Sequence, residues 1–458
     1  MNTSSSATLT GRFVDCVSSV RYADLPQALI PLSRDIVLDG LAVTLAGATE
    51  PLGLGRIVTD YTRDMGGNPQ ASVVAGGFKT SMPAAAFANG TMAHALDYDN
   101  TWYPLNHPTS PTLPAILAIA ENHRLSGRAV IESLVTAFEV QGRLRMAATG
   151  MDTGAGFHKP GMTGLMGAVA AAVRLLGLDR QRTLMAFGIA GSRAGSIAKN
   201  TGSMTKSSHS GHAARMGIEC ALLAHKGFTG TDDLFGAGGL FDTFWPGRAE
   251  PERLVDGFGA PYRMLDPGVG FKKHPCNYFT HRPIDAALAL RRDYRLEPNL
   301  IERVEVTFPH IEYIDRPQPV TGLDGKFSVQ YTTAVALVDG EITMDSFTNE
   351  RRFAADVTAL LPRVALRVDR SIPGDFDRMH VIVRIALKDG RMLEKRVSKL
   401  TGWCGVPLER DERLRKFYNC ALRVLERPAA ERLLELVDRL EQLEDVAEIC
   451  DIVRGPGA

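Results

Sequence analysis

The spacing of the apolar residues changes twice along the chain, and this limits the possible folds more than any other feature. Over the first ~265 residues the apolar side chains recur at the helical interval, as from Leu25 to Ala48. Near residue 300 the pattern becomes the alternation of a β-strand, and after Asp411 the helical interval returns. We therefore expect a helical part built from both ends of the chain and a part with strands between them.

The strands and helices expected from these patterns can be placed on the chain. Val304 to Phe308 alternates and is rich in β-branched residues, which predicts a strand. Two more strands are predicted on either side of Asp389-Gly390, a dipeptide typical of a tight hairpin: Val381 to Leu387 and Met392 to Val397. Further helices are predicted at Pro83 to Leu96, Pro114 to Asn122, Thr163 to Leu176 and Ala213 to His225. The segments Thr332 to Leu337 and Ile342 to Met344 fit a helix or a strand.

The length of 458 residues exceeds what one hydrophobic core usually organises, so two domains are expected. The predicted fold class is mainly α with an α+β part. A large all-helical, discontinuous domain would hold residues 1–268 and 401–458, and a smaller α+β lid domain would hold residues 269–400. A cleft between the two domains is the expected place for a site.

The charge balance and the cysteines exclude several classes of function. Lys+Arg and Asp+Glu both number 52, so the basic excess of a nucleic-acid-binding protein is missing. No apolar run is long enough to span a membrane, and the first seven residues do not resemble a signal peptide, so we expect a cytoplasmic protein. The six cysteines form no C-x-x-C pair, which argues against a zinc ribbon, an iron–sulfur cluster or a disulfide framework.

The first of four polar clusters combines histidines and aspartates, and it contains His94, Asp97, Asp99, Thr101 and His107. On a helix, His94, Asp97 and Thr101 would share one face. Asp97 could then orient or charge a neighbouring imidazole, and His107 could act on a substrate beside the helix that follows. In the plainer interpretation the two aspartates brace a turn and His94 packs in the core.

The second and third clusters each precede a predicted helix. His158 and Lys159 stand before a buried helix, where backbone N–H groups attract anions such as a substrate carboxylate. The run from Asn200 to Ala213 is rich in Gly, Ser and Thr, and its Lys206 could bind a carboxylate or stabilise an enolate. The plainer interpretations are a loop histidine with its hydrogen bonds satisfied and a solvated lysine in a capping run.

The fourth cluster falls at the predicted domain boundary, where cleft residues gather. It begins at Lys272 and ends at His281, the candidate acid or base. Cys276 is more typical of a small buried residue than of a nucleophile. Tyr313 follows later in the sequence, and its phenol could donate a proton; in the plainer interpretation it is half-buried at the end of a strand.

Taken together and in this order, the clusters resemble those of one protein family. The motifs are A-H-A-L-D-Y-D-N-T-W followed by H-P-T-S, G-S-M-T-K-x-x-H-x-G-x-A-A, G-F-T-G at 227–230, K-x-x-P-C-x-x-x-T-H, and Lys326 to Tyr331. On these motifs the sequence resembles the MmgE/PrpD family over essentially its whole length. That family contains 2-methylcitrate dehydratases, cis-aconitate decarboxylases and iminodisuccinate epimerases.

The resemblance implies a homodimer that uses no metal and no organic cofactor and acts on a small di- or tricarboxylate. It also places six residues in the active site: Asp97, Thr101, His107, His158, Lys206 and Tyr313. We expect His107 and His158 to be proton carriers, Asp97 the orienting carboxylate, Lys206 and His281 carboxylate binders, and Thr101, Tyr313 and Lys272 further substrate contacts. All three family reactions build up charge beside a carboxylate, so each needs cations to hold carboxylates and an acid–base group of near-neutral pKa. Histidine meets the second need.

Two departures from the family pattern leave open which of the three family reactions this chain would catalyse. Lys159 stands between His158 and Pro160, and Asn277 stands where the decarboxylase branch carries a further histidine. The leading prediction is a metal-free lyase or isomerase, most similar to a 2-methylcitrate dehydratase. A cis-aconitate decarboxylase and an iminodisuccinate-type epimerase are the alternatives.

Two further classes of protein compete with these enzymes. One is a relative that keeps the fold and binds a carboxylate without catalysis. The other is a metal-dependent hydrolase that would use His94, Asp97, Asp99 and His107. These residues are suitable ligand types, but they lack a recognised metal-binding spacing such as H-E-x-x-H.

Overall fold

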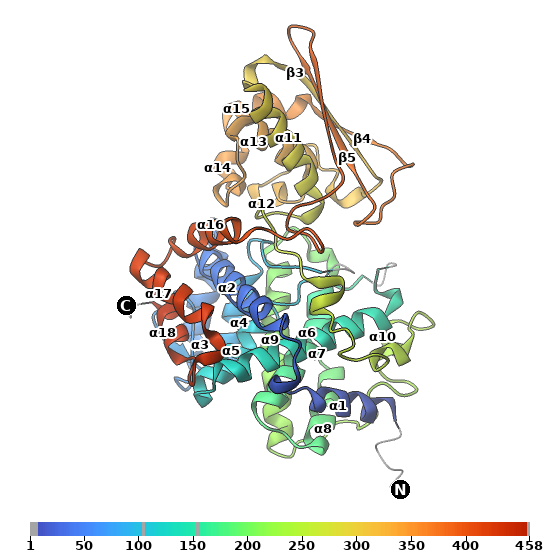
Figure 1. Ribbon diagram of the computed structural model, residues 1–458, viewed down its shortest axis with the longest axis vertical. Helices are drawn as coiled ribbons and strands as arrows, with labels where there is room; N and C mark the ends of the chain where they lie inside the picture. The colour runs from blue at the N-terminus through green and yellow to red at the C-terminus, as the bar shows by residue number, and fades with distance from the viewer. Residues whose placement is uncertain (1–7, 103–105, 153–155, 456–458) are drawn as a thin grey trace.

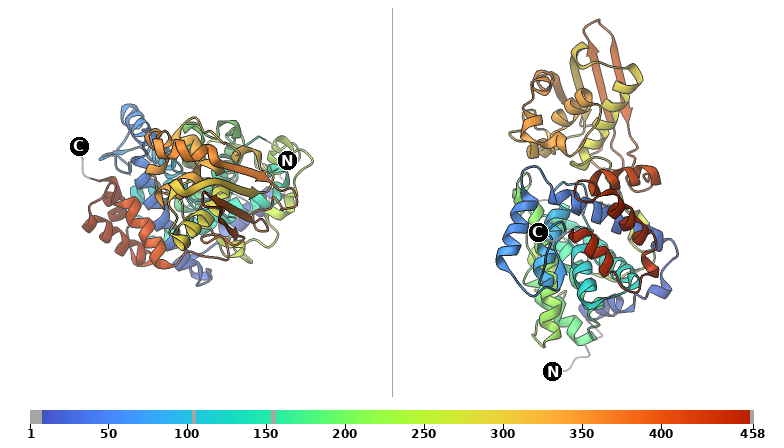
Figure 2. Two further views of the ribbon diagram at one scale, coloured as in Figure 1. Left: turned by 90° about the horizontal axis from the view of Figure 1, so that it is seen from above. Right: turned by 90° about the vertical axis from the view of Figure 1, so that its left-hand side faces the viewer.

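The computed structural model describes residues 8–102, 106–152 and 156–455. The first seven residues, from which the absence of a signal peptide was predicted, lie outside this part. Figure 1 shows a smaller upper part that holds the strands β3 to β5 and a larger helical lower part that holds both ends of the chain. The side view in Figure 2 shows the same division.

The larger part is built from helices of both ends of the chain. From the N-terminal side come α1 (Leu9–Ser19), α2 (Leu29–Ala48), α3 (Leu54–Met65), α4 (Met82–Ala93), α5 (Leu113–His123), α6 (Gly127–Ala147), α7 (Lys159–Leu175), α8 (Arg180–Gly191), α9 (Met204–His225) and α10 (Leu240–Phe244). From the C-terminal side come α16 (Arg410–Ala421), α17 (Arg427–Asp438) and α18 (Ala447–Arg454). The C-terminal helix α16 packs against α2 (Figure 1). A short hairpin joins β1 (Ala71–Ser72) to β2 (Lys79–Thr80).

The upper part is a sheet with helices on one face. Its strands are β3 (Ile301–Phe308), β4 (Val364–Val368), β5 (Val381–Leu387) and β6 (Met392–Val397), in the order β4-β3-β5-β6. The pairs β3–β5 and β5–β6 are antiparallel, and β3–β4 is parallel. The helices are α11 (His281–Tyr294), α12 (Gly322–Gly325), α13 (Val329–Asp339), α14 (Asn349–Arg352) and α15 (Ala355–Leu360). Alternate residues of β5 are buried, because its inner face packs on α11.

Two separate clusters of buried apolar residues organise these parts. The first includes Leu41, Ile116 and Val169 together with Phe417 and Leu433 from the C-terminal helices. The second contains the inner faces of β3 and β5 with residues of α11 and α13. We infer that these two cores correspond to the helical and α+β domains expected from the sequence. None of the helices in the described residues is long and apolar enough to cross a membrane.

Most of the predicted elements are present, and the differences have physical reasons. The hairpin strands β5 and β6 have the predicted bounds, and Thr332 to Leu337 lies inside the helix α13. Helix α9 begins at Met204, well before the predicted start at Ala213, so most of the third polar cluster is helical rather than a loop. The strand β4 was not predicted, because its pattern is mostly exposed and its parallel pairing to β3 leaves no local signal.

Glycines allow α4 and α9 to cross at close range, and this crossing places two of the polar clusters together. A Cβ on Gly211 would lie 2.2 Å from the carbonyl oxygen of Phe87 and 2.2 Å from Thr91 Oγ1. A Cβ on Gly90 would lie 2.8 Å from the Cα of Gly211. The backbones therefore touch at this point, with Lys206 one to two turns away on α9 and His94 at the end of α4.

Replacing Gly211 by alanine should destabilise the protein. The better helix propensity of alanine would contribute up to about 1 kcal/mol, but overpacking against fixed backbone atoms costs about 1–3 kcal/mol or more. We expect a lower melting temperature for Gly211→Ala in a thermal unfolding experiment. Gly374→Ala is the control, because no described atom outside its chain neighbours lies within 4 Å of a Cβ placed there. An unchanged melting temperature for Gly211→Ala would show that the helices can move apart without cost.

Candidate active site

A cavity of about 440 Å³ opens where the two cores meet. The larger part contributes the chain after α4 and the first turns of α7 and α9, and the upper part contributes segments near residues 277 and 313. Most of the residues singled out in the sequence line this cavity: Asp97, Thr101, His107, His158, Lys206, Lys272 and Tyr313. Segments that lie far apart in the sequence are therefore brought to one place.

Asp97 lies in an irregular segment rather than on a helix. Helix α4 ends at Ala93, and Asp97 has a left-handed backbone with φ of 51°. The prediction that His94, Asp97 and Thr101 share a helical face is therefore wrong. The backbone turn instead directs the Asp97 carboxylate toward two lysines, with Lys206 Nζ at 2.8 Å and Lys272 Nζ at 3.2 Å from Oδ1.

These lysines decide the charge of Asp97. Burial alone would raise the pKa of this carboxyl group, but the nearby ammonium groups of Lys206 and Lys272 outweigh burial and hold the pKa well below its usual value. Lys272 Nζ also donates to the Asp97 carbonyl at 2.6 Å and to the Cys276 carbonyl at 3.1 Å. Protein oxygens therefore surround the Lys272 ammonium group, so its geometry suits the holding of Asp97 more than direct contact with a substrate.

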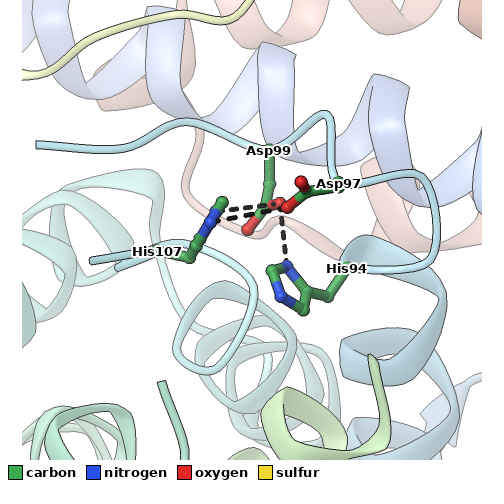
Figure 3. Close-up of side chains that lie close together, drawn as sticks. All are labelled: His94, Asp97, Asp99 and His107. Carbon is green, nitrogen blue, oxygen red and sulfur yellow. Dashed lines mark hydrogen bonds and ion pairs between the residues drawn. The ribbon is translucent and has the colours of Figure 1, made fainter. Parts of the chain in front are cut away.

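Two histidines and a second aspartate extend this network (Figure 3). Asp99 Oδ1 lies 2.9 Å from His94 Nδ1 and 3.2 Å from His107 Nδ1. His107 also approaches Asp97, with Nε2 at 3.6 Å from Oδ1. Burial lowers the pKa of His94 to about 4, although Asp99 acts in the opposite direction. The His107 ring thus spans two carboxylates at the wall of the cavity, where it can carry a proton.

His158 reaches the same cavity from a different helix. It is the N-cap residue of α7, which begins at Lys159 rather than at the predicted Thr163, and its ring lies 5.6 Å from that of His94. Its Nδ1 is 3.0 Å from Nδ1 of His209 on α9. Burial, with a further contribution from Lys206, lowers the pKa of His158 well below its usual value. His209 was not among the predicted site residues, although its place three residues after Lys206 in the third motif was an available signal.

Several polar atoms around the cavity have no hydrogen-bond partner among the described residues. They are Asp97 Oδ2, Thr101 Oγ1 and Asn106 Oδ1, and all three residues line the cavity. Buried polar atoms are rarely left unsatisfied, so their position suits contact with a polar ligand or water. Tyr313 lies at the edge of the cavity, where it is 43% exposed, and its hydroxyl donates to Asn277 Oδ1 at 3.4 Å.

Comparisons with known proteins place the chain in a family. The model of the MmgE/PrpD N-terminal domain matches residues 11–252, and that of the MmgE/PrpD C-terminal domain matches residues 274–442. The chain belongs to the MmgE/PrpD family. The C-terminal family model extends over α16 and α17, although these helices pack in the first core.

The relatives with curated names include lyases of this family. A cis-aconitate decarboxylase of Mus musculus is 31% identical, over 98% of this chain and 94% of its own length. The Homo sapiens cis-aconitate decarboxylase is 30% identical over a similar extent. A mitochondrial 2-methylcitrate dehydratase of Yarrowia lipolytica is 24% identical over 76% of this chain and 70% of its own. These similarities support an MmgE/PrpD-family lyase.

His281 is one predicted MmgE/PrpD site residue that the structure does not bring to the cavity. Its ring is fully buried at the start of α11, stacked on Tyr278 with ring centroids 4.6 Å apart. Neither ring nitrogen has a hydrogen-bond partner among the described residues, and burial lowers its pKa well below the usual value. Its nearest rings are those of Tyr278 and His274, and it does not line the cavity, so we do not include it in the site.

The cluster of His94, Asp97, Asp99 and His107 also meets the distance requirement for a metal site. One possible ligand atom from each residue lies within 4.8 Å of the others. However, the ammonium groups of Lys206 and Lys272 already contact Asp97, and a divalent cation would have to bind beside both of them. This electrostatic cost makes the cluster a poor fit for a metal and a better fit for proton transfer.

A second cavity, of about 510 Å³, borders Tyr98 and Lys273, the sequence neighbours of Asp97 and Lys272. Two of its cations are already paired. Lys416 Nζ lies 2.6 Å from Asp39, and Arg423 lies 2.7 Å from Asp345. The smaller cavity is the better candidate for catalysis, because His107, His158 and the residues with unsatisfied polar atoms line it.

Proposed function

We propose that this protein is a decarboxylase that acts on cis-aconitate or a similar unsaturated tricarboxylate. The proposal rests on one observation: Lys206, His107 and His158 line the same cavity beside the charged Asp97. Such a site can hold carboxylates and can move a proton next to one of them. The extent of similarity to cis-aconitate decarboxylases supports the choice of reaction.

The charge of the cavity supports a substrate with several carboxylates. Among the described residues, the lining contains the cationic side chains of Lys159, Lys206, Lys272 and Arg316 and the single carboxylate of Asp97. Arg316 also forms an ion pair with Asp324, outside the lining. Lys206 and Lys272 share the single carboxylate of Asp97, so one positive charge of this group remains for a substrate, which favours a carboxylate over a neutral compound.

The reaction can be written with these residues in place. The carboxylate on the methylene carbon of cis-aconitate leaves as carbon dioxide, and the electron pair of the broken C–C bond shifts along the double bond. Negative charge then builds up on the carbon at the far end, beside a second carboxylate, and a proton is added there. Lys206 would stabilise that charge, and His158 or His107 would supply the proton.

The dehydration of 2-methylcitrate, which was the leading prediction from the sequence, is the second candidate. The Yarrowia lipolytica relative supports it, at lower identity and over less of the chain. The same groups would serve, because dehydration removes a proton beside a carboxylate and protonates the leaving hydroxyl. Asn277 lies in the cavity and supplies a neutral amide where the decarboxylase branch was expected to carry a histidine.

Proton NMR in D₂O can distinguish these reactions. The purified, EDTA-treated protein would be given cis-aconitate, citrate, 2-methylcitrate and both enantiomers of several substituted succinates. We expect cis-aconitate to be converted to a five-carbon unsaturated diacid that carries one deuterium on carbon, with release of carbon dioxide. Loss of water from 2-methylcitrate would support the second candidate instead. α-Deuteration of a succinate without other change would indicate an epimerase, and no change with any compound would contradict the proposal.

A further inference from the structure

The contact between His158 and His209 joins two helices through identical ring nitrogens. His158 caps α7 and His209 lies on α9, and their Nδ1 atoms are 3.0 Å apart. The ring planes are inclined by 51°, with centroids 5.1 Å apart. His158 lines the cavity, whereas His209 is not among the lining residues and is only 8% exposed.

This geometry restricts where the protons of the two rings can lie. A hydrogen bond needs a hydrogen on one Nδ1 and a lone pair on the other. When both rings are neutral, one must therefore be the Nδ1–H tautomer and the other the Nε2–H tautomer. Because Nδ1 of His158 is occupied by His209, Nε2 is the nitrogen of His158 left to act on a substrate. The state of His209 thus decides whether that Nε2 offers a proton or a lone pair.

The surroundings favour a neutral pair. The groups that face it are cationic or can become so: Lys206 and His212 on α9, His94 after α4, and His107. Burial is the main cause of the lowered pKa of both rings, and it brings that of His209 to about 4. A neutral pair of complementary tautomers is therefore the expected state near pH 7.

We propose that His209 is a positioning residue that sets the tautomer of His158 and exchanges a proton with it through the two Nδ1 atoms. This rests on the proposed function, because it names how the acid of that reaction is supplied. In the forward step, His209 Nε2 takes a proton from water and its Nδ1 gives a proton to His158 Nδ1. His158 Nε2 then gives its own proton to the substrate carbon. One proton moves from water to carbon, hydroxide is left in the solvent, and both rings end neutral with their tautomers exchanged. Exchange of the ring protons with water then restores the starting tautomers.

Two substitutions of His209 distinguish proton transfer through this residue from its hydrogen bond to His158. The amide of His209→Asn can reach the position of Nδ1 and keep a hydrogen bond to His158, but it cannot pass a proton on. The side chain of His209→Leu fills the space and removes the bond. We expect kcat with cis-aconitate to fall on the order of 10-fold in His209→Asn and 100-fold in His209→Leu, with little change in KM. His212→Asn, one turn along the same helix and outside the cavity lining, is the matched control and should retain its kcat.

Neutron diffraction from deuterium-exchanged crystals at pH 7.5 tests the pair without any substrate. We expect deuterium on Nδ1 of His209 and none on Nδ1 of His158, and we expect His158 to be a mixture of both tautomers in His209→Leu. The same tautomer in both rings, or an unchanged kcat in His209→Leu, would overturn the proposal. If the unaltered protein does not convert cis-aconitate, the proposed function fails, while the neutron result still decides the tautomers.

Discussion

Replacing Lys206 by alanine should leave a folded protein that converts its substrate at least about 100-fold more slowly, because a charged donor beside the reacting carbon is lost. Lys206 Nζ donates to Asp97 Oδ1 at 2.8 Å and lies 5.4 Å from the centre of the Phe327 ring, inside the cavity. Of the two lysines at Asp97, Lys272 also donates to the backbone carbonyls of Asp97 and Cys276, whereas Lys206 Nζ donates to the carboxylate. Lys206 is therefore the better placed to turn toward a substrate carboxylate.

The fold should survive this change because Asp97 keeps a second partner. Lys272 remains 3.2 Å from the same carboxylate oxygen, so the buried charge is still compensated. Turnover of cis-aconitate, circular dichroism and the melting temperature should be measured together. Lys199→Ala, at an exposed position shortly before α9, is the matched control. Turnover close to that of the unaltered protein in Lys206→Ala would remove Lys206 from the proposed mechanism.

Acidification from pH 6.5 to pH 4 should reduce the free energy of unfolding by several kcal/mol. Burial lowers the pKa of His94 from 6.5 to about 4. Between these values the unfolded chain binds a proton at this residue and the folded protein does not, so stability rises with pH. The contribution is complete above pH 6.5 and is lost as the pH falls toward 4. A shift of this size corresponds to about 3 kcal/mol for His94 alone.

Other buried histidines act in the same direction. Burial also lowers the pKa of His158, His209 and His281. Calorimetric melting temperatures at pH 7.5, 6, 5 and 4.5 would test the prediction, and His94→Gln should make the decline shallower. His123→Gln, at the exposed end of α5, is the control and should not alter it. Equal melting temperatures at pH 7.5 and 5 would show that these rings are not held neutral in the folded protein.

Local patterns were enough to predict much of the fold. The bounds of β5 and β6 follow from alternating residues on either side of Asp389-Gly390, because a strand with one buried face and a tight turn both leave local signals. The start of α9 was predicted too late in the chain, because the local sequence there does not favour a helix. Its first turns are rich in Ser and Gly, which have low helix propensity, and packing against α4 compensates for that.

The motifs were enough to identify the kinds of residue in the site and the family to which the chain belongs. Asp97, His107, His158 and Lys206 were identified from motifs, and the cavity contains all of them. Motifs record which residues are present, but the direction of a side chain depends on its backbone and its neighbours. His281 belongs to a motif just as clear, yet α11 buries it against Tyr278.

Which of these side chains contact one another depends on the tertiary structure. The left-handed turn at Asp97 brings its carboxylate to Lys206, which is 109 residues away in the sequence. The packing of α7 on α9 brings His158 to His209, 51 residues away. No local pattern encodes such a pairing, because it results from close packing of two helices whose own sequences fix only their buried faces. The tertiary structure thereby changes a set of separate polar residues into one network that can move a proton.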